Sequence, residues 1–266
     1  MEYWQQKITV LNDSYDFLTH LPEEGVVDLL KEKFRPDPPK LTTHVFLIES
    51  TEHAPVLIDT GMGDRMAPMI EGHLLKALEF IGVKPEEIGV ILLTHLHGDH
   101  FYGLTDKTGR KMFPNAAVWI SEAEQNFWLR NNSLTGEDLQ NSKDAGEALA
   151  SYELLPVGSG SILPGISPVA LPGHTPGQTG FLVESEGERI LFCADLLTLP
   201  AIQTSLPDVG FSTDVDYTLA VQTRRDTLER AAKESLLLAG PHFEFPCLTY
   251  VQKKGDGYQL IPKQWF

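Results

Sequence analysis

Ile91-Leu-Leu-Thr-His-Leu-His-Gly-Asp-His100 is an apolar run that leads into four side chains able to bind a metal. If His95 and His97 keep the period of two that a strand imposes, both imidazoles point to the same side. Asp99 and His100 then lie where the chain turns, so they can approach the same point from another direction. Neutral imidazole and carboxylate are the ligands preferred by zinc and other borderline divalent metals. The segment therefore predicts a metal site at the end of a strand.

Three later segments also place a His or an Asp directly after an apolar strand. They are Leu171-Pro-Gly-His174, Ile190-Leu-Phe-Cys-Ala-Asp195 and Leu236-Leu-Leu-Ala-Gly-Pro-His242. Taken alone, such a residue is more often part of a turn or a cap. Together with the first motif, these three favour one shared site, which then takes five of the nine histidines.

The composition is that of a globular protein with its own hydrophobic core. The chain has 266 residues, of which 42% are hydrophobic and 22% are charged. A chain of this size buries about 75% of its unfolded surface, so we expect a single domain, residues 1–266. Its two cysteines, Cys193 and Cys247, provide no disulfide framework.

The charge of the chain narrows the range of partners. It has 21 Lys and Arg against 37 Asp and Glu, a formal net charge of −16, which repels phosphate backbones and anionic membranes. We therefore expect neither nucleic acid nor a membrane as partner, and a homodimer is the one assembly to test. The amino terminus has no basic start followed by an apolar segment, and no stretch reaches the roughly 18 apolar residues of a membrane span. We expect a cytoplasmic location.

Short apolar runs alternate with helical patterns along the chain. Strands are predicted at residues 7–11, 44–49, 55–58, 89–93, 116–120, 153–157, 166–171, 180–183, 190–193, 236–239 and 248–252. Helices are predicted at 66–81, 122–129, 137–150 and 215–234, the last capped by Asp214. Strands in two groups with helices between and after them predict a layered α/β architecture with two sheets and outer helices.

The Thr-His-x-His-x-Asp-His motif, followed in order by His174, Asp195 and His242, resembles the metallo-β-lactamase superfamily. The resemblance runs from Leu57-Ile-Asp-Thr-Gly61 to Gly240-Pro-His242. Within the superfamily the chain is most similar to the branch that contains methyl parathion hydrolase and the acyl-homoserine lactonases. Phe113-Pro-Asn-Ala, Phe127-Trp-Leu and Gly255-Asp-Gly-Tyr258 resemble the first of these. The resemblance implies an α/β fold, the αβ/βα four-layer sandwich of two mixed sheets flanked by helices.

The resemblance also implies two divalent metal ions per chain, with zinc expected first and manganese, cobalt or iron as alternatives. Seven side chains would supply the ligands: His95, His97 and His174 for one ion, Asp99, His100 and His242 for the other, and Asp195 as a bridge. Asp59, which precedes Thr60-Gly61, would orient a ligand histidine or its loop from behind. Its alternative role is simply that of an Asp opening a glycine turn.

A dinuclear metal-dependent hydrolase is the function that the resemblance implies. A hydroxide held between the two ions would attack a lactone, a carboxylic ester or a phosphotriester. Asp99 and Asp195 would be the catalytic carboxylates. The sequence has no Gly-x-Ser-x-Gly elbow, and Cys193 lies in an apolar strand, so neither a serine nor a cysteine nucleophile is expected.

Departures from the family pattern leave alternatives open. Acyl-homoserine lactonases carry a Tyr shortly after the bridging Asp, whereas Asp195 is followed by Leu196-Leu-Thr-Leu-Pro200. An acyl-homoserine lactonase active in quorum quenching therefore stands as an alternative to a hydrolase of other esters. A mononuclear iron enzyme resembling the sulfur dioxygenases is another, and a metal-binding protein without turnover is the third.

Apolar residues next to the ligands in sequence are candidates for the substrate pocket. They are Phe101, Leu196, Leu199 and Phe243; core packing is an equally good interpretation of each. If they line a pocket, the substrate is small and neutral or lipophilic. We then expect aryl esters, aromatic lactones or phosphotriesters to be hydrolysed better than acyl-homoserine lactones.

Overall fold

The computed structural model describes residues 6–8, 17–21, 25–37, 39–67 and 71–264. The chain divides into two compact units, each formed by two stretches of sequence. The first unit contains Met1–Gln6 and Thr43–Pro168, and the second contains Lys7–Thr42 and Val169–Phe266. β1 (Gln6–Ile8) and β3 (Leu41–Thr43) pair in a short two-stranded sheet.

The first unit is built on a five-stranded sheet in the order β4-β5-β6-β7-β8. Its strands are β4 (Phe46–Ile48), β5 (Val56–Ile58), β6 (Val90–Leu92), β7 (Ala117–Ser121) and β8 (Leu154–Val157). The pairings from β5 to β8 are parallel, and β4 adds an antiparallel edge. Because the carboxyl ends of parallel strands share one edge of a sheet, the loops after β5 and β6 emerge side by side.

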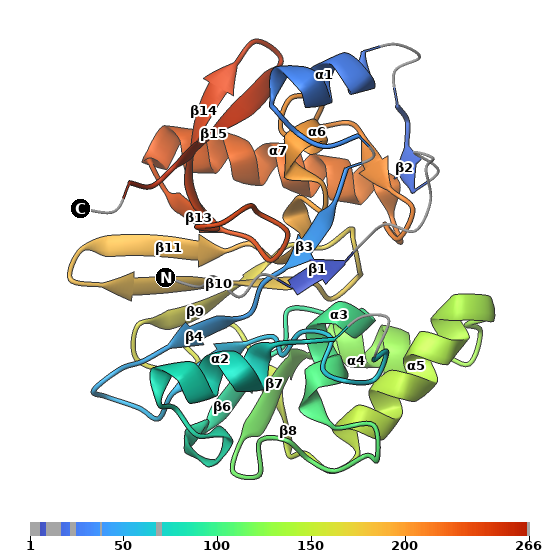
Figure 1. Cartoon of the computed structure of the whole chain (residues 1–266), viewed down its shortest axis with the longest axis vertical. Helices are drawn as coiled ribbons and strands as arrows, with labels where there is room; N and C mark the ends of the chain where they lie inside the picture. Colours follow the sequence, from blue (N-terminus) through green and yellow to red (C-terminus); the bar gives the residue numbers. More distant parts are fainter. Residues whose placement is uncertain (1–5, 9–16, 22–24, 38, 68–70, 265–266) are drawn as a thin grey trace. The chain divides into compact units, whose positions relative to one another are not determined.

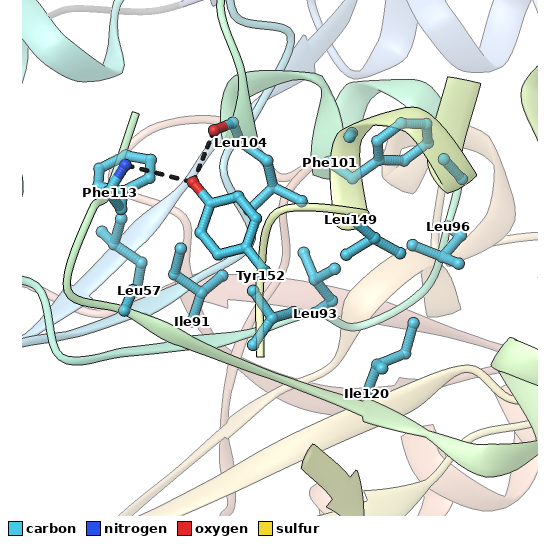
Figure 2. Packing of buried hydrophobic residues seen from close by; sticks show 14 of the residues in the cluster. Leu57, Ile91, Leu93, Leu96, Phe101, Leu104, Phe113, Ile120, Leu149 and Tyr152 are labelled. Carbon is cyan, nitrogen blue, oxygen red and sulfur yellow. Dashed lines mark hydrogen bonds between the residues drawn. The ribbon is translucent and has the colours of Figure 1, made fainter. Parts of the chain in front are cut away.

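Helices of the first unit pack on this sheet around a large hydrophobic cluster (Figure 1). They are α2 (Leu74–Ile81), α3 (Gly98–Phe101), α4 (Glu122–Leu129) and α5 (Gly136–Leu149), with short 3₁₀ turns at Pro85–Glu87 and Tyr102–Leu104. Figure 2 shows Tyr152 inside the cluster. Its buried hydroxyl donates to the carbonyl of Leu104 at 2.7 Å and accepts from the amide of Phe113 at 3.2 Å.

A six-stranded sheet has the order β15-β14-β13-β11-β10-β9, and its strands from β10 to β15 all lie in the second unit. Its strands are β9 (Ile166–Ala170), β10 (Thr179–Ser185), β11 (Glu188–Phe192), β13 (Leu237–Ala239), β14 (Leu248–Lys254) and β15 (Gly257–Pro262). Of the four pairings from β10 to β15, the pairing of β11 with β13 is parallel and the other three are antiparallel. The sheet is therefore mixed, like that of the first unit.

One long helix and several short elements complete the second unit. They are α1 (Val26–Glu32), α6 (Pro200–Gln203), α7 (Tyr217–Glu234), the 3₁₀ turn Ala194–Leu196, and the pair β2 (Leu18–Thr19) and β12 (Gly210–Phe211). α7 packs against β14, and α1 packs against α6. Among the described residues, no helix is both long and apolar enough to span a bilayer.

The structure confirms most of the predicted elements and corrects several. Of the helix predicted at 66–81, the structure confirms Leu74–Ile81. Residues 66 and 67 form a turn, residues 68–70 lie outside the described residues, and the Gly72 amide donates to the Gly63 carbonyl at 2.6 Å. The cap of α7 is Asp216, which accepts from the Leu219 amide at 3.0 Å, and not Asp214. β2, β3, β12 and β15 were not predicted, and most of the strand predicted at 7–11 lies outside the described residues.

Candidate metal centre

The first cluster comprises His95, His97, Asp99 and His100, which follow the carboxyl end of β6. The nitrogens His95 Nε2 and His97 Nδ1 lie 3.1 Å apart, and the rings of His95 and His100 have centroids 4.0 Å apart. His100 Nε2 lies 3.6 Å from Asp99 Oδ1. His95 and His100 are buried, whereas His97 and Asp99 are partly exposed. Two imidazole nitrogens that face each other at 3.1 Å share either one proton or one cation, so the geometry suits a common metal.

Asp59 holds this cluster from behind. Its Oδ2 accepts from His100 Nδ1 at 2.8 Å and from Thr94 Oγ1 at 2.9 Å, and its Oδ1 accepts from the Thr94 amide at 2.8 Å. Asp59 adopts a positive φ of 62° at the end of β5, and this conformation aims its carboxylate at the loop after β6. The carboxylate fixes the ring of His100 with Nε2 directed away, as an orienting partner of a metal ligand does.

Close backbone contact fixes the short helix that carries Asp99 and His100. The Thr60 amide donates to the His100 carbonyl at 2.7 Å, and the Gly103 amide donates to the Gly61 carbonyl at 2.9 Å. A Cβ on Gly103 would lie 2.1 Å from the Thr60 carbonyl oxygen. Only glycine allows this approach, so the segment after β5 and the helix after β6 form one rigid support.

The second cluster comprises His174, Asp195 and His242, which lie in loops after β9, β11 and β13. Asp195 Oδ2 lies 3.3 Å from His174 Nε2 and 3.0 Å from His242 Nε2. All three side chains are at most 5% exposed. The Asp195 amide donates to Gln178 Oε1 at 3.2 Å. One carboxylate oxygen thus faces two buried imidazoles, which is the arrangement expected of a carboxylate that serves two cations.

Both histidines of the second cluster are also oriented through Nδ1. His174 Nδ1 donates to Asp214 Oδ1 at 2.8 Å, and His242 Nδ1 donates to the Thr42 carbonyl at 2.6 Å. Gly173 forms the turn before His174 with a φ of 130°. A Cβ at this position would lie 2.2 Å from the Ala220 amide nitrogen, so the turn requires glycine. His100, His174 and His242 thus use Nδ1 for orientation and leave Nε2 for a ligand bond, whereas His97 directs Nδ1 toward His95 Nε2.

Sequence reasoning missed Asp214 as a partner of His174. Asp214 Oδ2 accepts from the Phe211 amide at 2.9 Å and lies 3.7 Å from Arg224 Nη2. Asp214 and Asp216 both precede α7, and only one of them can cap it. The presence of two Asp residues before α7 indicated that one of them has another role. Its pairing with His174 could not be predicted, because the two residues are 40 positions apart in sequence.

The electrostatics of the second cluster suit a cation. Burial lowers the pKa of His174, but the hydrogen bonds to Asp195 and Asp214 outweigh burial and raise the pKa to about 9. The positive charge of a protonated His174 thus balances the negative charge of the Asp195 and Asp214 carboxylates. A metal ion binds in place of such a proton and releases it. Imidazoles and carboxylates with these orienting partners fit borderline divalent ions such as zinc.

Comparison with known proteins decides the family. Residues 38–240 match the model of the metallo-beta-lactamase superfamily. The chain belongs to the metallo-beta-lactamase superfamily. An N-acyl homoserine lactonase of Bacillus cereus is 27% identical over 222 residues, covering 74% of this chain and 79% of that protein.

Two solved superfamily structures resemble the chain over almost its whole length. The hydrolase AbOPH has a TM-score of 0.88 at 27% identity and covers 98% of this chain and 93% of its own. The dizinc quorum-quenching lactonase AidC, solved in complex with a product, has a TM-score of 0.83 at 27% identity and covers 92% of this chain and 88% of its own. These likenesses confirm the α/β superfamily fold and a metal-dependent hydrolase with a dinuclear divalent metal site.

The proposed pocket residues of this superfamily member are all buried. Phe101 lies in the hydrophobic cluster of the first unit, where Figure 2 shows it. Leu199 packs with Leu18 and Ile202 in a separate cluster of the second unit. Leu196 and Phe243 are 3% and 2% exposed. Packing accounts for Phe101 and Leu199, and a pocket role for any of the four stays a prediction.

The environment of Cys193 does not suit a catalytic nucleophile. It is fully buried and lies two residues before Asp195 in sequence. Burial raises the pKa of the Cys193 thiol, and the negative charge of Asp195 raises it further. A thiol in this setting stays protonated at neutral pH, and only the thiolate is a strong nucleophile.

Proposed function

We propose that the first and second clusters together bind two zinc ions and that the chain uses them to hydrolyse a neutral lactone or ester. His95, His97 and His174 are proposed for one ion, Asp99, His100 and His242 for the other, and Asp195 for both. The observation that carries the assignment is Asp195 Oδ2, which lies within 3.3 Å of two oriented imidazoles. The imidazole and carboxylate chemistry of the other donors and the membership in the superfamily also support this assignment of ligands.

The chain's own residues prepare the site before any metal binds. Bound divalent ions would acidify water and polarise the oxygen of the electrophile. Asp59, Asp214 and the Thr42 carbonyl hold His100, His174 and His242 in fixed orientations. Rings that are already placed lose little further freedom on binding, which favours a defined coordination geometry.

Asp99 is our candidate for proton transfer to the leaving group. Its side chain is 20% exposed, and its Oδ2 accepts from Thr43 Oγ1 at 3.0 Å. A carboxylate within reach of solvent can both receive a proton and return it. Asp195, which is 4% exposed, is better placed to hold cations than to exchange protons with water.

A neutral substrate is supported by charge and by the relatives. The net charge of −16 disfavours a polyanionic substrate such as nucleic acid. The B. cereus relative and AidC are both lactonases, which makes lactones the first substrates to test. Phosphotriesters are a second candidate class, because Leu196-Leu-Thr-Leu-Pro200 contains no phenol that would mark an acyl-homoserine lactonase.

Metal quantitation combined with a substrate panel tests the proposal. Purified protein should contain about two zinc, manganese or cobalt ions per chain and should hydrolyse at least one of a lactone, an aryl ester and a phosphotriester. Chelation should abolish this activity, and added metal should restore it. One iron per chain without hydrolysis would instead support an oxidation reaction and overturn the proposal.

A further inference from the structure

The backbone of Leu96, between the ligand candidates His95 and His97, is held by side chains from two helices. The Leu96 amide donates to Glu124 Oε1 of α4 at 2.8 Å. Asn141 Nδ2 of α5 donates to the Leu96 carbonyl at 2.6 Å. These partners lie 28 and 45 residues away in sequence, so the tertiary fold, and not the local turn, fixes this peptide.

Leu96 is anchored by its side chain as well. It is fully buried in the hydrophobic cluster of the first unit, where Figure 2 shows it. In extended backbone, successive side chains point to opposite faces. Burying Leu96 on one face therefore directs His95 and His97 to the other.

Glu124 also links this peptide to the ring that packs against His97. Glu124 is fully buried, and its Oε1 accepts from Trp128 Nε1 at 2.7 Å as well as from Leu96. The indole of Trp128 lies edge-on to His97, with ring centroids 5.4 Å apart. Glu124 Oε1 thus holds both the Leu96 amide, which precedes His97, and the Trp128 indole, which packs against the His97 ring.

We propose that Glu124 and Asn141 are positioning residues that set the spacing of His95 and His97 and thereby the affinity of the chain for its metal. The inference rests on the proposed function, in which both histidines are ligands. Without Glu124, two buried N–H donors lose their acceptor, and the 3.1 Å approach of the two imidazoles is no longer enforced. Partners of this kind change metal affinity by about 10–100-fold.

The test compares Glu124→Ala, Glu124→Gln and Asn141→Ala with wild type. The amide oxygen of Gln can still accept from Leu96 and Trp128, so Glu124→Gln should restore most of the affinity that Glu124→Ala loses. Glu122→Ala, an exposed change in the same helix, is the matched control. Zinc affinity is measured by chelator competition, the ligand field by the visible spectrum of the cobalt(II) form, and the stability of the metal-free form by thermal unfolding.

We expect Glu124→Ala to bind zinc about 10–100-fold more weakly and to alter the cobalt spectrum, with Glu122→Ala unchanged. Wild-type affinity and spectrum in a folded Glu124→Ala that is merely less stable would overturn the inference. If Glu124→Ala does not fold, Asn141→Ala decides: its side chain is only partly buried, and unchanged zinc affinity there would overturn the inference equally. A wild type that fails to bind two ions would refute the proposed function itself.

Discussion

At Asp195 a single carboxylate oxygen faces two buried imidazoles, and this residue carries the strongest expectation at the residue scale. Since Asp195 is proposed to touch both ions, Asp195→Ala should lower occupancy at both sites, not at one. Removing it also leaves two cations facing each other with less negative charge between them. Metal content per chain and zinc affinity by chelator competition measure this. One site still filled at normal affinity would show that the carboxylate is not shared.

His97 offers the complementary test, because it is partly exposed and lies outside the hydrophobic cluster. His97→Ala should reduce kcat/KM by at least about 100-fold, more than the loss of an orienting partner costs. The circular dichroism spectrum should stay unchanged, because both sheets remain intact. A variant that keeps most of its activity with full metal content would remove His97 from the site.

At the scale of elements, Lys33 ties the end of α1 to α6. Its Nζ donates to the Ala201 carbonyl at 2.7 Å, to Ser205 Oγ at 2.6 Å and to Thr204 Oγ1 at 3.3 Å. Burial lowers the pKa of Lys33 to about 8. Between this value and the ordinary pKa of 10.5, the unfolded chain binds more protons than the folded one. The contribution of Lys33 to stability therefore rises with pH across this window.

Lys33→Met should remove that pH-dependent contribution. We expect the difference in unfolding free energy between wild type and Lys33→Met to shift in favour of wild type from pH 8 to pH 10.5. Urea unfolding at several pH values measures it, with the exposed Lys31→Met as control. A difference that stays constant with pH would contradict the lowered pKa.

Tyr152 tests how the hydrophobic cluster of the first unit is held. Tyr152→Phe removes the hydroxyl that connects the Leu104 carbonyl to the Phe113 amide. The Leu104 carbonyl keeps the Met112 amide as a donor, but the Phe113 amide stays buried without this acceptor, which costs about 1–3 kcal/mol of unfolding free energy. Urea unfolding measures the loss, and zinc affinity should not change. Unaltered stability would mean that another group takes over the two hydrogen bonds.

The same scale shows what local sequence can and cannot predict. α4 spans Glu122–Leu129, as its pattern predicts, and the buried strands that lead to the ligands were recognised from their apolar runs. The helix predicted at 66–81 was wrong at the described residues 66–67 and 71–73, where the contact between Gly63 and Gly72 overrides the local periodicity. Asp214 and Glu124 escaped prediction for a related reason: each acts on a residue 28 or more positions away.

At the scale of the whole molecule, the order of the seven predicted donors along the chain pointed to the superfamily, and the match of residues 38–240 to the superfamily model confirms it. Substrate preference is less constrained, since it depends on a few side chains around the proposed metal site. The B. cereus lactonase and AidC are each 27% identical to this chain, which leaves room for a different pocket.

The segment after Asp195 carries the last prediction. A lactonase-type phenol is absent from Leu196-Leu-Thr-Leu-Pro200, so polarisation of the electrophile would depend on the bound ions alone. Substrates with good leaving groups lose least when such a donor is missing, because an electron-withdrawing leaving group already makes the electrophilic centre more reactive. We therefore expect aryl esters, aromatic lactones or phosphotriesters to show higher kcat/KM than a long-chain acyl-homoserine lactone. If the acyl-homoserine lactone is preferred by more than about tenfold, or about 1.4 kcal/mol in transition-state free energy, the missing phenol does not limit the reaction, and the chain's preference is that of its lactonase relatives.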